Sequence, residues 1–188
     1  MANPNDIRTY HGIYMDPFSA KESEIDIRDI AHALSLLCRA NGHIKHFYSV
    51  AQHCLNCEKE AQARGYNARI RLLCLLHDAT ECYISDITRP VKTRLPEYRK
   101  AEEQLAEVIY KKLVCSVPDE QEQKVIGEID DTLLHHEFFA LCGAKIFDIE
   151  PKMVCDISFD TEDIKAVEQR YIDVYNELIS RLEANKNG

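Results

Sequence analysis

Residues 75–81 read LLHDATE, and this stretch decides how the rest of the chain is interpreted. It continues an apolar run that starts at Ile70 and leaves almost no polar face, which is typical of a central, buried helix. His77, Asp78 and Glu81 then follow within little more than one helical turn. Burying such groups without partners is costly, whereas an imidazole beside a carboxylate commonly holds a divalent metal ion. The stretch therefore indicates a candidate metal site whose remaining ligands must come from elsewhere in the chain.

The composition indicates one globular domain spanning residues 1–188. Of the 188 residues, 45% are hydrophobic, which is enough for a substantial core. No apolar run reaches the ~18 residues that a membrane span needs, and the polar N-terminus lacks the apolar segment of a signal peptide. We therefore expect a cytoplasmic protein without a membrane partner. The net charge of −9 argues against binding a nucleic-acid polymer, but a metal and a few local cations would still hold a small phosphorylated ligand.

Hydrophobic periodicity predicts an all-α bundle of about six helices and no sustained β-strand. The segments with a helical period run approximately over residues 27–40, 50–64, 67–84, 96–114, 119–142 and 160–184.

The segments between and around these helices carry their own signals. Ser49 and Gln52 fit a capping box at one helix start, and Asp119 with Glu122 fits another. Pro90 is expected to keep the segment 84–92 out of helix. Residues 1–24 form a loop-rich lead-in and residues 185–188 a polar tail.

Further metal ligands must come from two other helices. His53 follows the capping box, where a lone histidine is more often structural. Asp130 lies on the buried face of the 119–142 helix, whereas Asp131 points more sideways, so the spacing favours Asp130 slightly. His135 and His136 are weaker candidates, because they cannot share the face of Asp130 closely.

The chain has eight cysteines and no secretion signal, which indicates free, buried thiols. Cys54-x-x-Cys57 is the one suggestive pair, but the second C-x-x-C of a zinc ribbon is absent. Helix packing is the favoured interpretation. The alternative, a redox or zinc module, predicts metal binding that depends on both thiols and survives loss of His77.

The order His53, His77-Asp78, Asp130 resembles the H…HD…D signature of HD-domain metal-dependent phosphohydrolases. The similarity is more specific than these four residues and covers roughly residues 27–141. It resembles a branch that includes bacterial 5′-deoxynucleotidases and phage-type dNTP phosphohydrolases. The segments that carry it are residues 49–53 (SVAQH), 76–81 (LHDATE) and 86–92 (DITRPVK).

The resemblance implies an HD-type helical bundle and a role for each residue of the signature. His53, His77, Asp78 and Asp130 would hold one divalent ion, of which Mn, Co, Zn, Fe and Ni are the candidates. The ion would turn a bound water into a nucleophile near neutral pH. Glu81 would position that water or carry its proton as a general acid/base.

The resemblance also implies three substrate contacts. Arg39 matches a phosphate-contacting arginine, Asp86 a carboxylate that contacts the sugar, and Lys92 a phosphate-contacting lysine of the dNTP-cleaving relatives. One departure concerns the position after the arginine, where relatives carry a bulky aromatic residue and this chain has Ala40.

The function we expect is hydrolysis of a phosphate ester in a nucleotide, most simply release of phosphate from deoxynucleoside 5′-monophosphates. The alternative within the same class is a dNTP phosphohydrolase. A different class is a non-catalytic nucleotide-binding protein that keeps the metal as a structural staple. Such a binder has no need for an acid/base beside the metal, so Glu81 favours the enzyme. We also expect a homo-oligomer.

Overall fold

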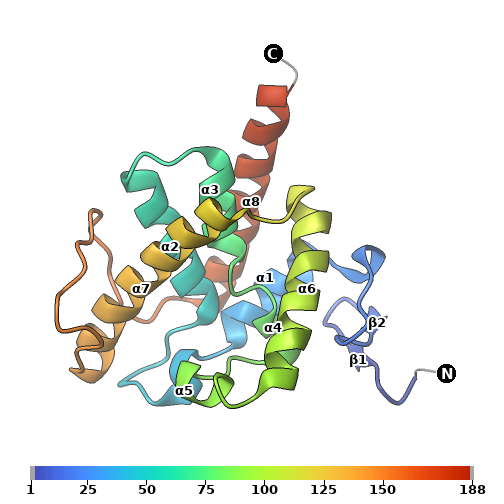
Figure 1. Ribbon diagram of the computed structural model, residues 1–188, viewed down its shortest axis with the longest axis horizontal. Coiled ribbons are helices and arrows are strands. Elements are labelled where there is room, and N and C mark those ends of the chain that lie inside the picture. Colours follow the sequence, from blue (N-terminus) through green and yellow to red (C-terminus); the bar gives the residue numbers. More distant parts are fainter. Residues whose placement is uncertain (1–2, 187–188) are drawn as a thin grey trace.

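The computed structural model describes residues 3–186 and shows a helical bundle with one short hairpin near the N-terminus (Figure 1). Six helices of nine or more residues within this range correspond to the six predicted ones, and the all-α prediction is confirmed. The elements are β1 (Ile7–Arg8), β2 (Tyr14–Met15), η1 (Glu22–Glu24), α1 (Ile27–Leu36), η2 (Arg39–Gly42), α2 (Val50–Ala63), α3 (Ala68–Leu76), α4 (Glu81–Ile84), α5 (Arg89–Lys92), α6 (Pro96–Val114), α7 (Glu120–Cys142) and α8 (Ile164–Lys186).

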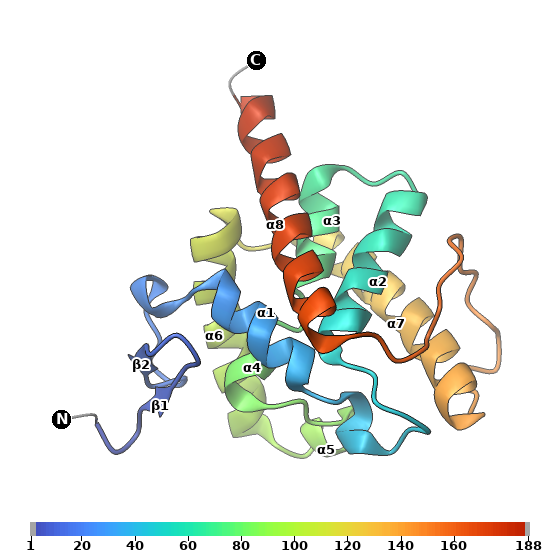
Figure 2. The same cartoon turned by 180° about the vertical axis from the view of Figure 1, so that it is seen from behind.

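Helix α3 is the centre of the bundle, as its apolar sequence predicts. Every residue from Ile70 to Leu76 is buried. The helix packs against α2, α6, α7 and α8, and the two opposite views show α7 on one side of it and α8 on the other (Figures 1 and 2). Burying one leucine side chain contributes about 1.5–3 kcal/mol, so this helix anchors the fold and fixes the position of the residues that follow it.

The predicted continuous helix over residues 67–84 is wrong, because α3 ends at Leu76 with His77 as its C-cap. The His77 imidazole Nδ1 donates to the Cys74 carbonyl at 2.8 Å, which in a continuing helix would accept from the Asp78 backbone N–H. The chain then makes a turn before α4 begins. In this turn the backbone hydrogen bonds span three residues instead of four, from Ala79 N–H to the Leu76 carbonyl and from Glu81 N–H to the Asp78 carbonyl. The break lies within the sequence that carries the polar groups.

Two other helix boundaries differ from the prediction. Pro90 does not exclude helix, because it lies in the first turn of α5, where no backbone N–H is needed. The first helix ends at Leu36 rather than near residue 40, because the next residues pair with the segment before α2 instead. Val50 N–H donates to the Leu37 carbonyl and Arg39 N–H to the Tyr48 carbonyl.

The helix caps and the two terminal segments largely match the prediction. The predicted capping boxes at Ser49 and Asp119 are both present. The lead-in contains the antiparallel β1–β2 pair, and Met15 is buried in the core. Of the predicted polar tail, 185–186 belong to α8 and 187–188 lie outside the described residues. Within residues 3–186, no helix is long and apolar enough to cross a membrane.

Candidate metal centre

Four side chains from three parts of the chain meet beside the end of α3. His53 comes from the first turn of α2, His77 and Asp78 follow α3, and Asp130 comes from α7. The Nε2 atoms of His53 and His77 lie 3.2 Å apart. His53 Nε2 lies 3.1 Å from the nearest Asp130 oxygen and 3.7 Å from Asp78. The corresponding distances from His77 Nε2 are 3.8 Å and 3.3 Å. These are the four residues that the sequence predicts as ligands.

These spacings fit one divalent ion. Nitrogen and oxygen ligands lie about 2.0–2.2 Å from such an ion, so neighbouring ligand atoms are about 3.0–3.5 Å apart. Burial raises the pKa of Asp130, but hydrogen bonds from the His53 and His77 imidazoles outweigh it and hold that pKa well below its usual range. Asp130 is therefore an ionised carboxylate, the form that coordinates a metal.

Hydrogen bonds on the far side of each imidazole leave the two Nε2 atoms free to coordinate. His53 Nδ1 lies 2.8 Å from Glu137 Oε1, and His77 Nδ1 lies 2.8 Å from the Cys74 carbonyl. A carboxylate and a carbonyl only accept, so both Nδ1 atoms carry the hydrogen. Each Nε2 faces the shared centre and, once metal binding displaces its proton, would present its lone pair to the ion, as in most histidine-bound metal sites.

Glu137 is the hub of the layer behind the ligands. It is buried, and it accepts from the Tyr48 hydroxyl at 2.9 Å as well as from His53. Arg39 donates to its other oxygen at 3.4 Å and to Asp78 at 3.0 Å. Burial raises the pKa of Glu137, but the opposing effect of His53 and Arg39 is larger. The net pKa is lowered, so this carboxylate stays ionised. The layer fixes both ligand geometry and charge.

The sequence contained only part of the signal for Glu137. Glu137 lies two turns after Asp130 on the same helix face, but this spacing alone predicts no role for it. The orienting contact with His53 depends on how α2 crosses α7, which helical spacing alone does not give.

Glu81 lies next to the four ligands without joining them. It is 5% exposed, and its Oε2 atom has no hydrogen-bond partner. Burial, followed by the Asp78 and Asp86 carboxylates, raises the pKa of Glu81 well above its ordinary value. A carboxyl group with a raised pKa can hold and release a proton near neutral pH, which is the property a general acid/base needs.

The three predicted substrate contacts lie around this centre. Arg39 pairs with Asp78 and Glu137. Asp86 accepts a hydrogen bond from the Ala40 backbone N–H at 3.1 Å. Ala40 has a left-handed φ of 51°, which turns that N–H toward the carboxylate. Lys92 pairs with Glu102 at 2.6 Å, and the Glu81 and Asp78 carboxylates contribute to raising its pKa.

The competing candidates point elsewhere. Asp131 is 43% exposed and pairs at 2.9 Å with Arg89, which also reaches the second Asp130 oxygen at 3.4 Å. His135 Nδ1 accepts from the Phe147 backbone N–H, and His136 Nε2 donates to the Pro151 carbonyl. These three side chains therefore contact groups other than the two histidines, whereas Asp130 contacts both.

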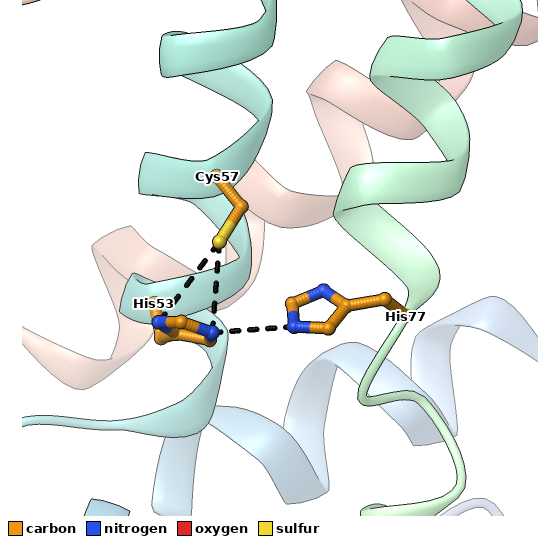
Figure 3. A group of neighbouring side chains, drawn as sticks. All are labelled: His53, Cys57 and His77. Carbon is orange, nitrogen blue, oxygen red and sulfur yellow. Dashed lines mark hydrogen bonds between the residues drawn. The ribbon is translucent and has the colours of Figure 1, made fainter. Parts of the chain in front are cut away.

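The Cys54-x-x-Cys57 pair lies against the same centre. Figure 3 shows His53 and Cys57 on α2 facing His77 across the gap between the helices. Cys57 Sγ lies 3.5 Å from Nε2 and 4.0 Å from Nδ1 of His53, so the sulfur sits over the ring rather than along the Nε2 lone pair. Burial raises the pKa of the Cys54 thiol.

Two groups of potential ligand atoms include these thiols, and both require His77. Sγ of Cys57 lies within 4.8 Å of both imidazoles, and Sγ of Cys54 within 4.8 Å of His77 and Asp78. A C-x-x-C module that binds metal without His77 does not match this arrangement. The thiols form the buried wall of the centre.

The fold and the site together define a helical metal-binding domain with a histidine and aspartate ligand set. Residues 37–138 match the family described as HD domain, and because this is more than half of the chain, the protein belongs to that family. HD domains bind divalent metals and are typically metal-dependent hydrolases.

Two curated relatives are similar to part of the chain. The uncharacterized protein YfdR of Escherichia coli (strain K12) is 41% identical over 107 residues, which are 56% of this chain and 57% of YfdR. An uncharacterized protein of Rhodobacter capsulatus is 40% identical over 93 residues, 47% of each chain. The matches thus span about half the length of these relatives.

Proposed function

We propose that the protein is a metal-dependent phosphohydrolase of nucleotides, with deoxynucleoside 5′-monophosphates as the leading substrates. The observation that carries this proposal is the division of labour beside α3. Four candidate ligand side chains meet there, while Glu81 is buried beside them with an unpaired carboxyl oxygen. A purely structural metal has no use for such a group.

In this proposal the ligands are His53, His77, Asp78 and Asp130. A divalent ion held by them would lower the pKa of a bound water and polarise a phosphate oxygen. The Nδ1 hydrogen bonds of the two histidines hold their rings in the coordinating orientation. Because the groups are already in place, little free energy is spent on reorganisation when substrate arrives.

Glu81 acts as the general acid/base. Its buried position with one unpaired carboxyl oxygen allows it to take a proton from the attacking water and return it to the leaving oxygen. In the metal-free protein, burial raises the pKa of Glu81 and the Asp78 and Asp86 carboxylates raise it further, so the residues that build the site also act on this group.

Positive and negative groups around the centre bind the substrate. Arg39 contacts the phosphate, Asp86 the sugar hydroxyl, and Lys92 adds a second cation. Arg39 is 11% exposed and rigidly paired, so it offers a fixed donor geometry. Hydrolysis of dNTPs is the second candidate function, favoured by the presence of both Arg89 and Lys92 on α5, which supply charge for additional phosphates.

The test is phosphate release by protein stripped of metal and reloaded with Mn²⁺ or Co²⁺. A panel of dNMPs, NMPs and dNTPs separates the two candidates by product, because a dNMP yields orthophosphate and a dNTP yields triphosphate or stepwise products. We expect the highest kcat/KM on a dNMP and none in the stripped protein. Absence of hydrolysis across the panel, with one ion bound per chain, would contradict the proposal.

A further inference from the structure

A cavity of about 510 Å³ lies between the N-terminal lead-in, α1 and α4. Its walls are largely apolar and include Ile7, Leu36 and Leu37. At its rim the Tyr10 ring stacks on His32, with ring centroids 3.7 Å apart and planes at 14°. This size is within the range of pockets that enclose small organic ligands.

Three buried polar atoms without hydrogen-bond partners belong to residues that line this cavity. They are Asp29 Oδ2, Glu81 Oε2 and the Tyr83 hydroxyl, and among the described residues no other fully buried side-chain nitrogen or oxygen lacks a partner. Buried polar groups in folded proteins are almost always paired. All three side chains also line one cavity, so a ligand bound there, with these side chains turned toward it, would supply the missing partners.

Asp29 defines the chemistry that the cavity requires. Its Oδ1 is already engaged, since the His11 backbone N–H donates to it at 2.8 Å and His11 Nδ1 lies at the same distance. Oδ2 is left as an acceptor, and a carboxylate cannot donate. A ligand must therefore offer an N–H or O–H donor here, and a carbonyl oxygen in that place would be repelled.

We propose that this cavity binds a nucleobase that carries an exocyclic amino group, with the amino group donating to Asp29. The proposal rests on the proposed function, because it names the nucleotides that the reaction centre would receive. The apolar walls suit a flat ring, and Tyr83 offers a hydroxyl that both donates and accepts. Glu81 belongs to the cavity and to the surroundings of the metal ligands, so a base held here lies next to the reaction centre.

Binding of nucleosides without phosphate tests the cavity separately from hydrolysis. Deoxycytidine and deoxyuridine form one pair, and deoxyadenosine and deoxyinosine another, because each pair differs by an amino group against a carbonyl. By titration calorimetry, we expect the amino member of at least one pair to bind 10-fold or more tightly. Equal binding within both pairs, or no binding by any of the four, would overturn the proposal.

Asp29→Asn is the decisive variant, because the His11 N–H holds the amide oxygen and turns the amide NH₂ into the cavity. We expect the preference for the amino nucleoside to disappear or reverse. Tyr83→Phe, which keeps the packing, should weaken binding several-fold and serves if Asp29→Asn does not fold. The control Asp173→Asn, on the exposed face of α8, should retain wild-type selectivity. An unchanged preference in folded Asp29→Asn would also overturn the proposal.

The same measurement separates this inference from the proposed function. Selective nucleoside binding without phosphate release from any nucleotide would support the cavity and contradict the hydrolase. Where hydrolysis occurs, competitive inhibition by the preferred nucleoside assigns the cavity to the base of the substrate. A change in kcat at saturating substrate assigns it to a separate effector nucleoside of the same chemistry.

Discussion

The metal centre and the neighbouring cavity differ in whether their buried polar groups have hydrogen-bond partners. Around the metal centre, His53, Glu137 and Tyr48 are linked in one chain of hydrogen bonds, which Asn56 extends at 2.7 Å. In the cavity, three polar atoms are buried and unpaired. A closed network holds a geometry before anything binds, whereas unpaired groups are stabilised only when a ligand supplies their partners.

Glu81 stands at the boundary between these two regions. It borders the preorganised ligands and lines the incomplete cavity. Because the Glu81 carboxyl oxygen has no hydrogen-bond partner in the ligand-free protein, it is available to exchange a proton with a bound substrate. On this difference we base the proposal that one region binds the ion and the other recognises the substrate, and the predictions below separate them.

The largest effect is expected from Asp130→Ala, with Asp131→Ala as the matched control. Asp130 faces both histidines, whereas Asp131 faces Arg89 at the surface. Loss of a direct ligand should lower metal affinity by more than the 10–100-fold that is typical of supporting residues. Metal content after dialysis checks this. If Asp131→Ala loses the ion and Asp130→Ala keeps it, the ligand set is wrong.

Glu137→Gln should weaken metal binding about 10–100-fold, because the ring of His53 loses its orienting carboxylate. Competition with a chelator measures the affinity. Glu60→Gln is the control, since Glu60 is an equally buried carboxylate that pairs with Arg64 and the backbone of residues 154–155. Its loss should lower stability and leave metal affinity unchanged, and equal effects of both variants would remove the special role of Glu137.

Glu81→Gln should stabilise the metal-free protein at neutral pH. The folded-state pKa of Glu81 is raised by burial and nearby carboxylates, so its ionisation disfavours the folded state. The wild type should therefore lose stability as pH rises above the unfolded pKa, at up to about 1.4 kcal/mol per pH unit, until the folded pKa is passed. The variant should lack this loss, and the two proteins should converge below about pH 4. Denaturant unfolding in chelator checks this, and parallel curves would contradict it.

The smallest effects come from two buried tyrosine hydroxyls, one paired and one unpaired. Tyr48→Phe should cost about 1 kcal/mol or more, because its hydroxyl donates to Glu137. Tyr83→Phe should be neutral or slightly stabilising in the absence of ligand, because its hydroxyl is unpaired. Unfolding midpoints of both variants give the comparison directly. Equal destabilisation would mean that the cavity groups are satisfied in the free protein.

Local sequence signals predicted much of this structure. Capping residues such as Ser49 and Asp119 act within a few positions, and the apolar run before His77 leaves no face for solvent. The four residues proposed as ligands were also identified from spacing and family resemblance, and the structure brings them together. Such features depend on nearby residues or on a recognisable order.

The remaining features depend on tertiary contacts that spacing does not contain. The end of α3 is set by the His77 side chain capturing the Cys74 carbonyl, which competes with the helix. The role of Glu137 depends on the crossing of α2 and α7. The cavity arises because the lead-in packs over α1 and α4, and no sequence period reports which polar atoms such packing leaves without partners.

The central claim is that one residue set binds the ion and Glu81 acts beside it. Metal content and phosphate release of Glu81→Gln, measured on one preparation, test it most directly. We predict one ion per chain, as in the wild type, and phosphate release lowered about 10²–10⁴-fold, the usual contribution of a general acid/base. Wild-type turnover in this variant, or loss of the ion together with activity, would contradict the account.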